Sequence, residues 1–265
     1  MQIKLIIIVT LAGLLAGMAL FIPFEHIRLY LNPTGLLLVV GGTLAGAFIA
    51  YPFRSLCSLI RHICGMRDHG MDQEELVETF TSLSDIKRRA GVRQLEAAVM
   101  ENGNIFLQMG VGMVVDNHDR LEIRQRLDQE MDMFITRRES EIAILSLMGR
   151  LAPAFGLAGT VFGLIRMLHG LSDPNLVAAG MSVALLTTFY GIMLANLIIL
   201  PLERKLRERL RQETVEMTIM IEGIMGLALD ENKVAIAARL RSYHLTQTPG
   251  QGMMEIRLNN LQGSI

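Results

Sequence analysis

The stretch LAPAFGLAGTVFGLI, residues 151–165, is the part of the sequence that says most about the fold. It is apolar enough to lie in a membrane, but a helix that only had to dissolve in lipid would carry leucine and valine instead of small residues. Its unusual residues for such a helix are Gly156, Gly159, Gly163, Thr160 and Pro153. The three glycines lie three and four residues apart on one helical face, which predicts close packing against another helix.

The composition places the chain among membrane proteins. Of its 265 residues, 51% are hydrophobic and only 19% are charged. The formal net charge of −1 provides no overall field that would attract nucleic acid. Cys57 and Cys64 are seven residues apart, with no CxxC motif and no His/Cys cluster nearby. We therefore expect two reduced structural thiols on one helical face, with no metal and no cofactor.

Four uncharged or nearly uncharged runs predict four transmembrane helices. They cover residues 5–22, 34–53, 142–168 and 176–202, and each is long enough to cross a hydrocarbon core of about 30 Å. The first run could pass for a signal peptide, but a second apolar run follows almost at once, so we interpret it as a retained span. Strand patterns are essentially absent. The predicted fold class is therefore all-α, a polytopic membrane protein with long helical extensions.

Basic residues flank these runs on one side only. They follow the second and fourth runs and precede the third, whereas the loops 23–33 and 169–175 hold little that is basic. The positive-inside rule then places both termini in the cytoplasm of a bacterium, with the protein in the inner membrane. The predicted organisation is helices 1 and 2 in 1–53, a cytoplasmic helical domain in 54–141, helices 3 and 4 in 142–202, and a cytoplasmic helix and tail in 203–265.

The block 54–141 has its own helical pattern. Apolar residues recur at the spacing of an amphipathic helix that ends at Gly91. The predicted buried face of this helix consists of Leu76, Val77, Phe80, Leu83 and Ile86. A second helix is expected to end at Gly103, and residues 119–145 predict one long helix that runs into the third span. A helical stripe also continues beyond the fourth span, and the last 20 residues show no periodicity.

No Asp or Glu occurs in the four uncharged cores. A proton or sodium path normally needs an ionisable group within the membrane, so the carboxylate would have to come from another chain. The polar groups nearest mid-depth are Thr160, Thr187 and Thr188. Tight packing within the monomer, with the threonines bonded to their own backbone, is one interpretation. A wall around a partner's helix is the other, and the pairing of small faces with hydroxyls on the third and fourth spans favours it.

The sequence resembles the MotA/PomA family of flagellar stator A-subunits, within the wider MotA/TolQ/ExbB group. The resemblance rests on GRLAPAFGLAGTVFGLI, on LNPTGLLLVVGGTLAGAFIAYP and on VALLTTFYG followed by Asn196 and Pro201. It implies a homo-pentamer around a dimer of a B-type subunit (MotB/PomB-like) that supplies the membrane aspartate. It also implies ion flow that drives a rotor. The sequence has no nucleotide-binding loop, no metal cluster and no membrane-buried acid/base pair, so we expect no enzyme activity.

The resemblance implies roles for individual positions. Thr160 and Thr188 match threonines that line the ion path, with Thr187 beside them, and Pro153 and Pro201 match prolines that couple ion passage to shape change. Proline suits that role because it removes a backbone hydrogen bond and leaves a point where a helix can bend. The alternative for Pro201 is that it merely ends a span.

The same resemblance implies a surface for the rotor switch protein (FliG-like) at Arg88, Arg89 and Glu96. Exposed charge pairs are individually weak, so such contacts can form and break as the rotor passes. The alternative is an ordinary solvated helix end.

Arg150 departs from the family pattern, because flagellar members usually carry an acid there. A basic residue would tend to repel cations, or it could pair with a carboxylate of a neighbouring subunit. Arg166 is similarly unusual and could extend to the membrane surface. A TolQ/ExbB-like energiser of a trans-envelope machine and a scaffold without ion flux therefore remain alternatives. The resemblance implies that the transported ion is H⁺ or Na⁺, and the two threonines favour Na⁺ because hydroxyl oxygens can replace part of a hydration shell.

Overall fold

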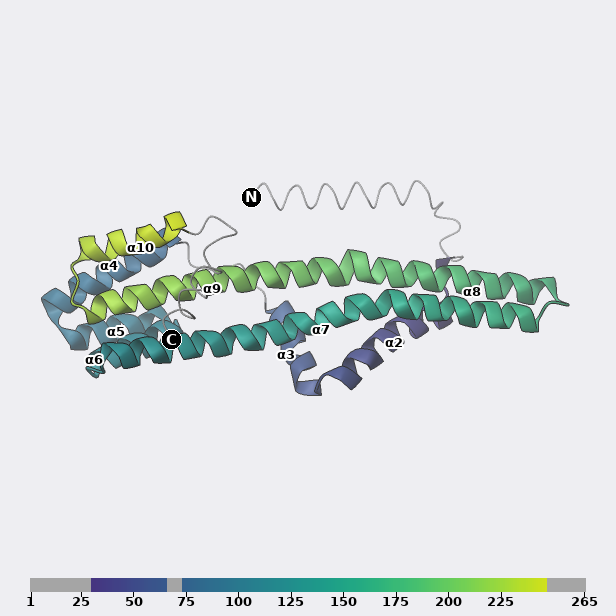
Figure 1. Ribbon diagram of the computed structural model, residues 1–265, viewed down its shortest axis with the longest axis horizontal. Helices are drawn as coiled ribbons and strands as arrows, with labels where there is room; N and C mark the ends of the chain where they lie inside the picture. Colours follow the sequence, from purple (N-terminus) through teal and green to yellow (C-terminus); the bar gives the residue numbers. More distant parts are fainter. Residues whose placement is uncertain (1–29, 66–72, 247–265) are drawn as a thin grey trace, which may run out of the picture. The chain divides into compact units, whose positions relative to one another are not determined.

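The protein is helical throughout the residues that the computed structural model describes, 30–65 and 73–246, and no strand occurs in those ranges (Figure 1). The helices are α2 (Pro33–Ala50), α3 (Phe53–Cys64), α4 (Gln73–Ala90), α5 (Val92–Asn102), α6 (Ile105–Val115), α7 (Arg120–His169), α8 (Pro174–Met193), a π-helix η2 (Leu194–Ile199), α9 (Leu200–Ala228) and α10 (Lys233–Thr246). The predicted first span, 5–22, and the tail from 247 lie outside the described residues.

Three helices of this part of the chain are long and apolar enough to cross a membrane. They are α2, α7 and the continuous helix from Pro174 to Ala228 that contains α8, η2 and α9. The third and fourth predicted spans fall within them, and the second does so up to Ala50, where α2 ends three residues before the predicted boundary. The all-α fold with membrane-spanning helices is confirmed. The 50-residue α7 and the helix 174–228 are both far longer than the roughly 20 residues a bilayer requires.

Asx–proline pairs begin two of these helices. The Asn32 side chain accepts a hydrogen bond from the Gly35 amide at 3.0 Å, and the Asp173 side chain accepts one from the Asn175 amide at 2.9 Å. Each cap is followed by a proline at the start of the helix, where the missing amide hydrogen costs nothing. The start points of α2 and α8 are therefore fixed by local chemistry.

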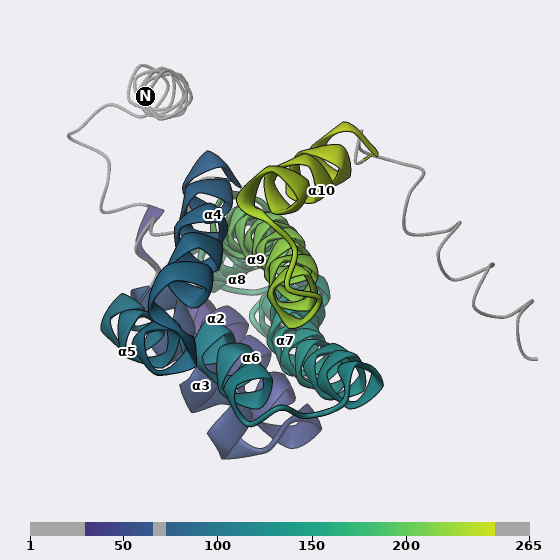
Figure 2. The same ribbon diagram turned by 90° about the vertical axis from the view of Figure 1, so that its left-hand side faces the viewer.

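The chain divides into two compact units. Of the described residues, the first unit contains 30–61 and 141–205 and is called the membrane unit here. The second contains 62–65, 73–140 and 206–246 and is called the bundle unit. Within the membrane unit, α2 packs against α8. The helices α4, α5, α6 and α10 and the nearby parts of α7 and α9 form the bundle unit, whose helix ends are visible in Figure 2.

The bundle unit confirms the amphipathic pattern of α4. Its apolar face is buried in a single core, where Phe80 is fully enclosed and rests directly on Gly223 of α9. Gly91 and Gly103 end α4 and α5 as predicted, with φ of +85° and +72°. Glycine adopts this left-handed region without steric cost, which explains why the chain turns at these two points.

Two helices of the bundle unit were not predicted. The helix α6 is apolar on all sides, so its sequence IFLQMGVGMVV has no amphipathic period to detect. The helix α10 buries only Ile236 and Leu240 fully, which is too few positions to form a pattern. Tertiary burial, rather than local periodicity, determines both.

Candidate functional site at the seam between α7 and α8

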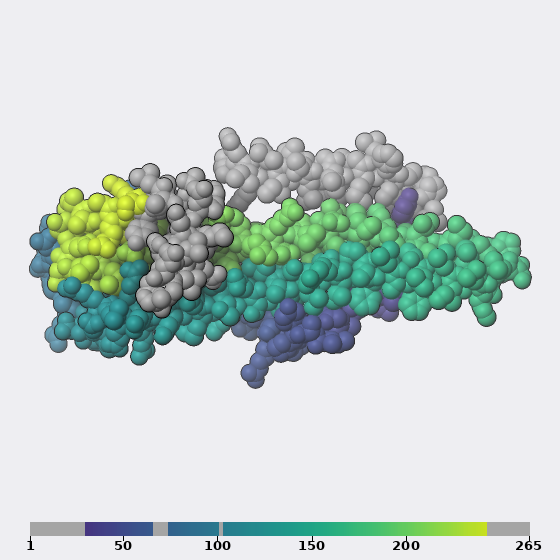
Figure 3. Space-filling model, viewed as in Figure 1, coloured from purple at the N-terminus to yellow at the C-terminus, as the bar shows by residue number. Residues whose placement is uncertain are grey.

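The backbones of α7 and α8 touch along a seam of small residues. A Cβ atom placed on Gly163 would lie 2.6 Å from the Gly180 carbonyl oxygen and 2.7 Å from the Ala184 nitrogen. A Cβ atom on Gly191 would lie 2.6 Å from the Ala152 carbonyl oxygen. These distances leave no room for a methyl group, and the two helices meet without an intervening side-chain layer. In Figure 3 the teal surface of α7 and the green surface of α8 lie directly against each other.

The glycines of residues 151–165 therefore face a helix of their own chain. Gly156 and Gly159 approach Thr187 and Thr188 of α8, and Gly163 approaches Gly180 and Ala184. The expectation that this face receives a helix from another chain is corrected: the face is already filled by α8. The small residues of both spans therefore serve tight packing within the monomer, which was the other interpretation of the sequence.

Thr187 is a packing residue at the centre of this seam. It is fully buried, and its hydroxyl donates to the Val183 and Ala184 carbonyl oxygens at 2.9 and 3.0 Å. A Cβ atom on Gly159 would overlap its side chain, and one on Gly35 of α2 would lie 2.9 Å from its Cγ2. Its hydroxyl is thus directed to its own backbone, between two neighbouring helices.

Thr160 and Thr188 have a different environment, because both are only partly buried. The Thr160 hydroxyl donates to the Leu157 carbonyl oxygen at 2.6 Å. The Thr188 hydroxyl lies 3.5 Å from the Ala184 carbonyl oxygen, a distance at which a hydrogen bond is weak. The Thr188 backbone adjoins Gly156, one helical turn before Thr160. The two threonines are therefore the polar groups at the edges of the seam.

Irregular backbone occurs in both helices at the same level of the seam. Pro153 lies inside α7, where it cannot donate to the Gly149 carbonyl. Across the seam, Gly149 adjoins Ile199 and Leu200, at the end of η2. Pro201 follows directly, at the start of α9, and the helix continues past it to Ala228.

The π-helix η2 explains how the chain accommodates Pro201. In η2 the Leu200 amide bonds to the Ala195 carbonyl, five residues back, so the turn is wider than an α-turn. The Asn196 side chain donates to the Ile192 carbonyl oxygen at 3.0 Å, in the last turn of α8 before η2. Its amide is thus bonded to the backbone of its own helix, which a polar side chain within a membrane requires.

A tyrosine clamp joins α8 to the start of α2. The Tyr190 hydroxyl accepts a hydrogen bond from the Asn32 amide at 2.8 Å and donates to the Tyr30 carbonyl oxygen. Sequence reasoning missed this clamp. The available signal was a tyrosine within an apolar span, because a phenol hydroxyl there usually finds a partner.

Tyr190→Phe is expected to lower the free energy of unfolding of the membrane unit by about 1–2 kcal/mol, because it leaves one amide and one carbonyl without their partner. Tyr30→Phe is the matched control, since only the Tyr30 backbone takes part in the clamp. Thermal unfolding in lipid nanodiscs measures both variants. Equal midpoints for the two variants would contradict the clamp.

In the bundle unit, the predicted rotor residues Arg88, Arg89 and Glu96 are all exposed. Arg89 approaches Asp85 only at 4.0 Å. Their neighbour Lys87 behaves differently: its ammonium group donates to the Leu227 carbonyl oxygen at 2.6 Å and pairs with Asp230. Lys87 therefore fixes α4 to the turn after α9, while the following arginines stay at the surface.

The bundle unit also contains a buried carboxylate that the sequence did not reveal. Glu222 is 3% exposed and accepts from Arg124 at 2.9 Å and from Arg239 at 3.5 Å. Arg239 also pairs with Glu231, and that hydrogen bond raises the pKa of Arg239 above its ordinary value. The guanidinium group therefore remains charged, and the network joins α7, α9 and α10.

Other candidate residues lie at the surface. Arg150 and Arg166 are exposed on α7, Cys57 is half-buried and Cys64 is exposed. Within the described ranges no group of three His, Cys, Asp or Glu residues could hold a metal ion.

The fold and the seam define a helical membrane protein whose described spans, 33–50, 142–169 and 174–202, carry threonine hydroxyls and no carboxylate. Residues 94–219 match the model of the MotA/TolQ/ExbB proton channel family. The chain is 31% identical over 236 residues to the uncharacterized protein YtxD of Bacillus subtilis, covering 88% of this chain and 85% of that one. It is 30% identical over 240 residues to the chemotaxis protein PomA of Vibrio alginolyticus, covering 88% and 94%. The chain belongs to the MotA/TolQ/ExbB proton channel family.

A solved structure extends the likeness to the fold. The flagellar MotAB stator complex from Bacillus subtilis matches with a TM-score of 0.78 and 26% identity, over 98% of this chain and 97% of that one. The resemblance to the MotA/PomA stator A-subunits, inferred from the sequence, is thereby confirmed.

Proposed function

We propose that this chain is the ion-conducting A-subunit of a flagellar stator. With a B-type partner (MotB/PomB-like), it couples the flow of H⁺ or Na⁺ across the inner membrane to torque on the rotor. The observation that carries the proposal is the pair of partly buried threonines, Thr160 and Thr188, beside a seam of a stator-like fold. Over the described parts of the spans, 33–50, 142–169 and 174–202, no Asp or Glu is present, so the titrating carboxylate comes from the partner.

Thr188 is the better placed of the two to contact an ion. Its hydroxyl donates only weakly to the Ala184 carbonyl oxygen, so it can rotate to direct a lone pair at an ion at little cost. Thr160 already makes a short bond to Leu157, which still leaves a lone pair of its oxygen available. The Thr187 hydroxyl is bonded to two carbonyl oxygens of its own helix, so Thr187 supports the path by packing and does not contact the ion.

Pro153 and Pro201 are proposed as the coupling residues. Both interrupt the hydrogen-bond ladder of a long helix, and Pro201 follows a π-turn, so each marks a place where a small rearrangement is inexpensive. Ion binding at the partner's carboxylate would then bias the helix geometry at these positions. The rotor contact, a FliG-like protein, would be made by Arg88, Arg89 and Glu96, whose exposure leaves them accessible.

The remaining organisation follows from the resemblance and the charge pattern. We propose four transmembrane helices, both termini in the cytoplasm, and a homo-pentamer around the B-type subunits. The domains are 1–53, 54–141, 142–202 and 203–265 as expected from the sequence. Conduction and torque require no enzyme activity and no cofactor beyond the transported ion. The TolQ/ExbB-like alternative is less well supported, because the solved match is a flagellar stator complex.

Thr188→Ala is expected to abolish ion-driven rotation while the complex with the B-type subunit still assembles. The physical reason is that the substitution removes a hydroxyl oxygen at the ion path and creates no clash. The measurement is swimming speed in sodium-free and sodium-rich media, together with co-purification of the partner. Speed that follows sodium in the parent chain would identify Na⁺ as the ion, and indifference to sodium would identify H⁺.

Thr214→Ala is the matched control for this experiment. Thr214 is also a half-buried threonine on a long helix, and its hydroxyl bonds to the Leu210 carbonyl oxygen at 2.8 Å, but it lies outside the apolar run. It should leave motility unchanged. Full motility of Thr188→Ala in a host without a second stator would refute the ion-path assignment and favour a scaffold.

A further inference from the structure

The turn end of the α7–α8 hairpin carries a cavity that the proposed ion path does not use. It is a shallow cavity, open to its surroundings, with a volume of about 640 Å³. The wall is mostly apolar with two basic side chains: it is lined by Phe162, Ile165, Arg166, Leu168, His169, Gly170 and Leu176. The cavity lies at the end of two spans, where the headgroups of a bilayer are found.

The cavity lies on a different face of α7 from the threonine edge. Phe162, Arg166 and His169 are four and three residues apart and share one face. Phe155, two turns before Phe162, packs on Gly42 of α2, so this is the face that α2 covers further along the helix. The cavity residues continue that face toward the turn, beyond the α2 contact.

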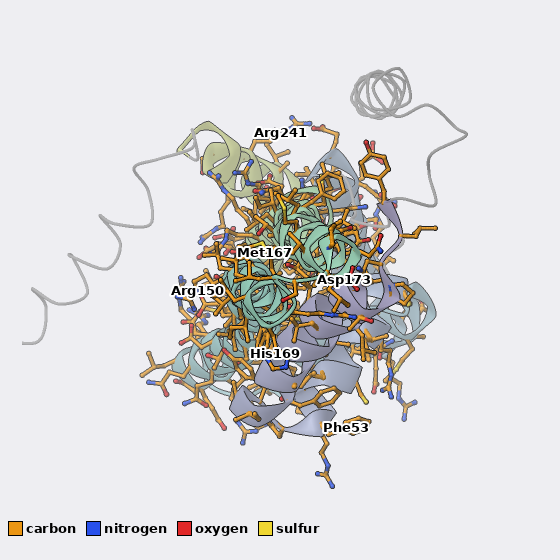
Figure 4. All side chains as sticks on the ribbon, turned by 90° about the vertical axis from the view of Figure 1, so that its right-hand side faces the viewer. Phe53, Arg150, Met167, His169, Asp173 and Arg241 are labelled. Atoms are coloured by element: carbon orange, nitrogen blue, oxygen red, sulfur yellow. The ribbon has the colours of Figure 1, made fainter. Side chains whose placement is uncertain are left out.

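The formal charge of the cavity lining is positive and comes from Arg166. Arg166 and His169 are exposed, and no carboxylate is among the lining residues. The carboxylate of the turn, Asp173, is bonded to the Asn175 amide at 2.9 Å, and Figure 4 shows Asp173 and His169 on different sides of the hairpin end. Basic residues in the last turn of α7 also complement the helix dipole, but that effect needs no apolar cavity beside them.

We infer that this cavity binds an anionic phospholipid. An acyl chain lies on Phe162, Ile165 and Leu168, and the phosphate accepts hydrogen bonds from the Arg166 guanidinium with His169 beside it. The planar fork of arginine matches phosphate oxygens, and its long aliphatic stem lets the charge reach headgroup depth from an apolar wall. The inference requires a membrane location but does not depend on the ion path.

The test is the lipid occupancy of the purified full-length chain, measured by native mass spectrometry with phosphatidylglycerol and phosphatidylcholine of identical acyl chains. Arg166→Gln is expected to reduce phosphatidylglycerol binding about tenfold, the factor expected for one charge-assisted hydrogen bond. Ile165→Trp should reduce binding of both lipids, because the larger side chain fills the apolar wall.

Arg150→Gln is the matched control, since it removes an exposed arginine from the same helix. Arg150 and Arg166 are sixteen residues apart, which at about 100° per residue places their side chains about 160° apart around α7. Figure 4 shows Arg150 on another side of the helix from His169. It should leave lipid binding unchanged. Equal losses for Arg150→Gln and Arg166→Gln would overturn the inference in favour of general surface charge. Displacement of the lipid by glycerol phosphate alone would overturn it in favour of a simple anion site.

Discussion

Gly163→Ala is expected to break the seam between α7 and α8 and to lower the free energy of unfolding by about 3 kcal/mol, the upper end for an overpacked site. The added methyl group would lie 2.6 Å from one backbone atom and 2.7 Å from another. Backbone atoms of a helix cannot move aside as the end of a flexible side chain can, so the helices must separate. Loss of the folded hairpin would also prevent assembly with the B-type subunit.

Gly41→Ala is the control for this prediction. Gly41 also lies in a membrane helix, but nothing lies within 4 Å of a Cβ atom placed there. It should be neutral or slightly stabilising, because alanine favours the helix more than glycine does. Both variants are compared by thermal unfolding and by the yield of the assembled complex. A stable, assembled Gly163→Ala protein would show that the seam can open without cost.

The double variant Arg124→Ala with Arg239→Ala is expected to destabilise the bundle unit by about 3–5 kcal/mol. It removes both cations that contact Glu222, whose side chain is only 4% exposed. A buried carboxylate without a counter-charge must then either stay ionised at high cost or become protonated. The unfolding midpoint and amide exchange in α10 report the loss.

Adding Glu222→Leu to the double variant separates charge from packing. Without the carboxylate there is no buried charge to compensate, so much of the lost stability should return. Arg241→Ala provides the comparison at the surface, because Arg241 and Glu74 are each 64% exposed and such pairs contribute little. Failure of Glu222→Leu to restore stability would mean that the arginines act mainly through their aliphatic stems.

Sequence patterns predicted the parts of the fold that depend on local chemistry. The amphipathic face of α4, the turns at Gly91 and Gly103 and the continuous α7 all follow from periodicity or from backbone preference. The partner of the glycine face could not be predicted in the same way. Small residues show that a helix approaches closely, but they do not say whether that helix belongs to the same chain.

The polar contacts of the site were harder to predict for a related reason. Tyr190 reaches a backbone 158 residues away, and Glu222 meets Arg124 across 98 residues. No local pattern records such pairs, because only the tertiary fold brings them together. The three threonines were visible in the sequence, but their different burial and bonding became clear only once α7 and α8 were paired.

The π-turn also sets the phase of the helix that contains it. Buried residues recur at Thr187, Gly191, Ala195 and Ile199, three successive steps of four where a regular helix would alternate three and four. The wider turn absorbs the extra residue and keeps Ile199 beside Gly149. Loss of one residue between Gly191 and Ile199 would turn everything after it by about 100°. Chain length in this segment is therefore as much a determinant of the contact as the identity of its side chains.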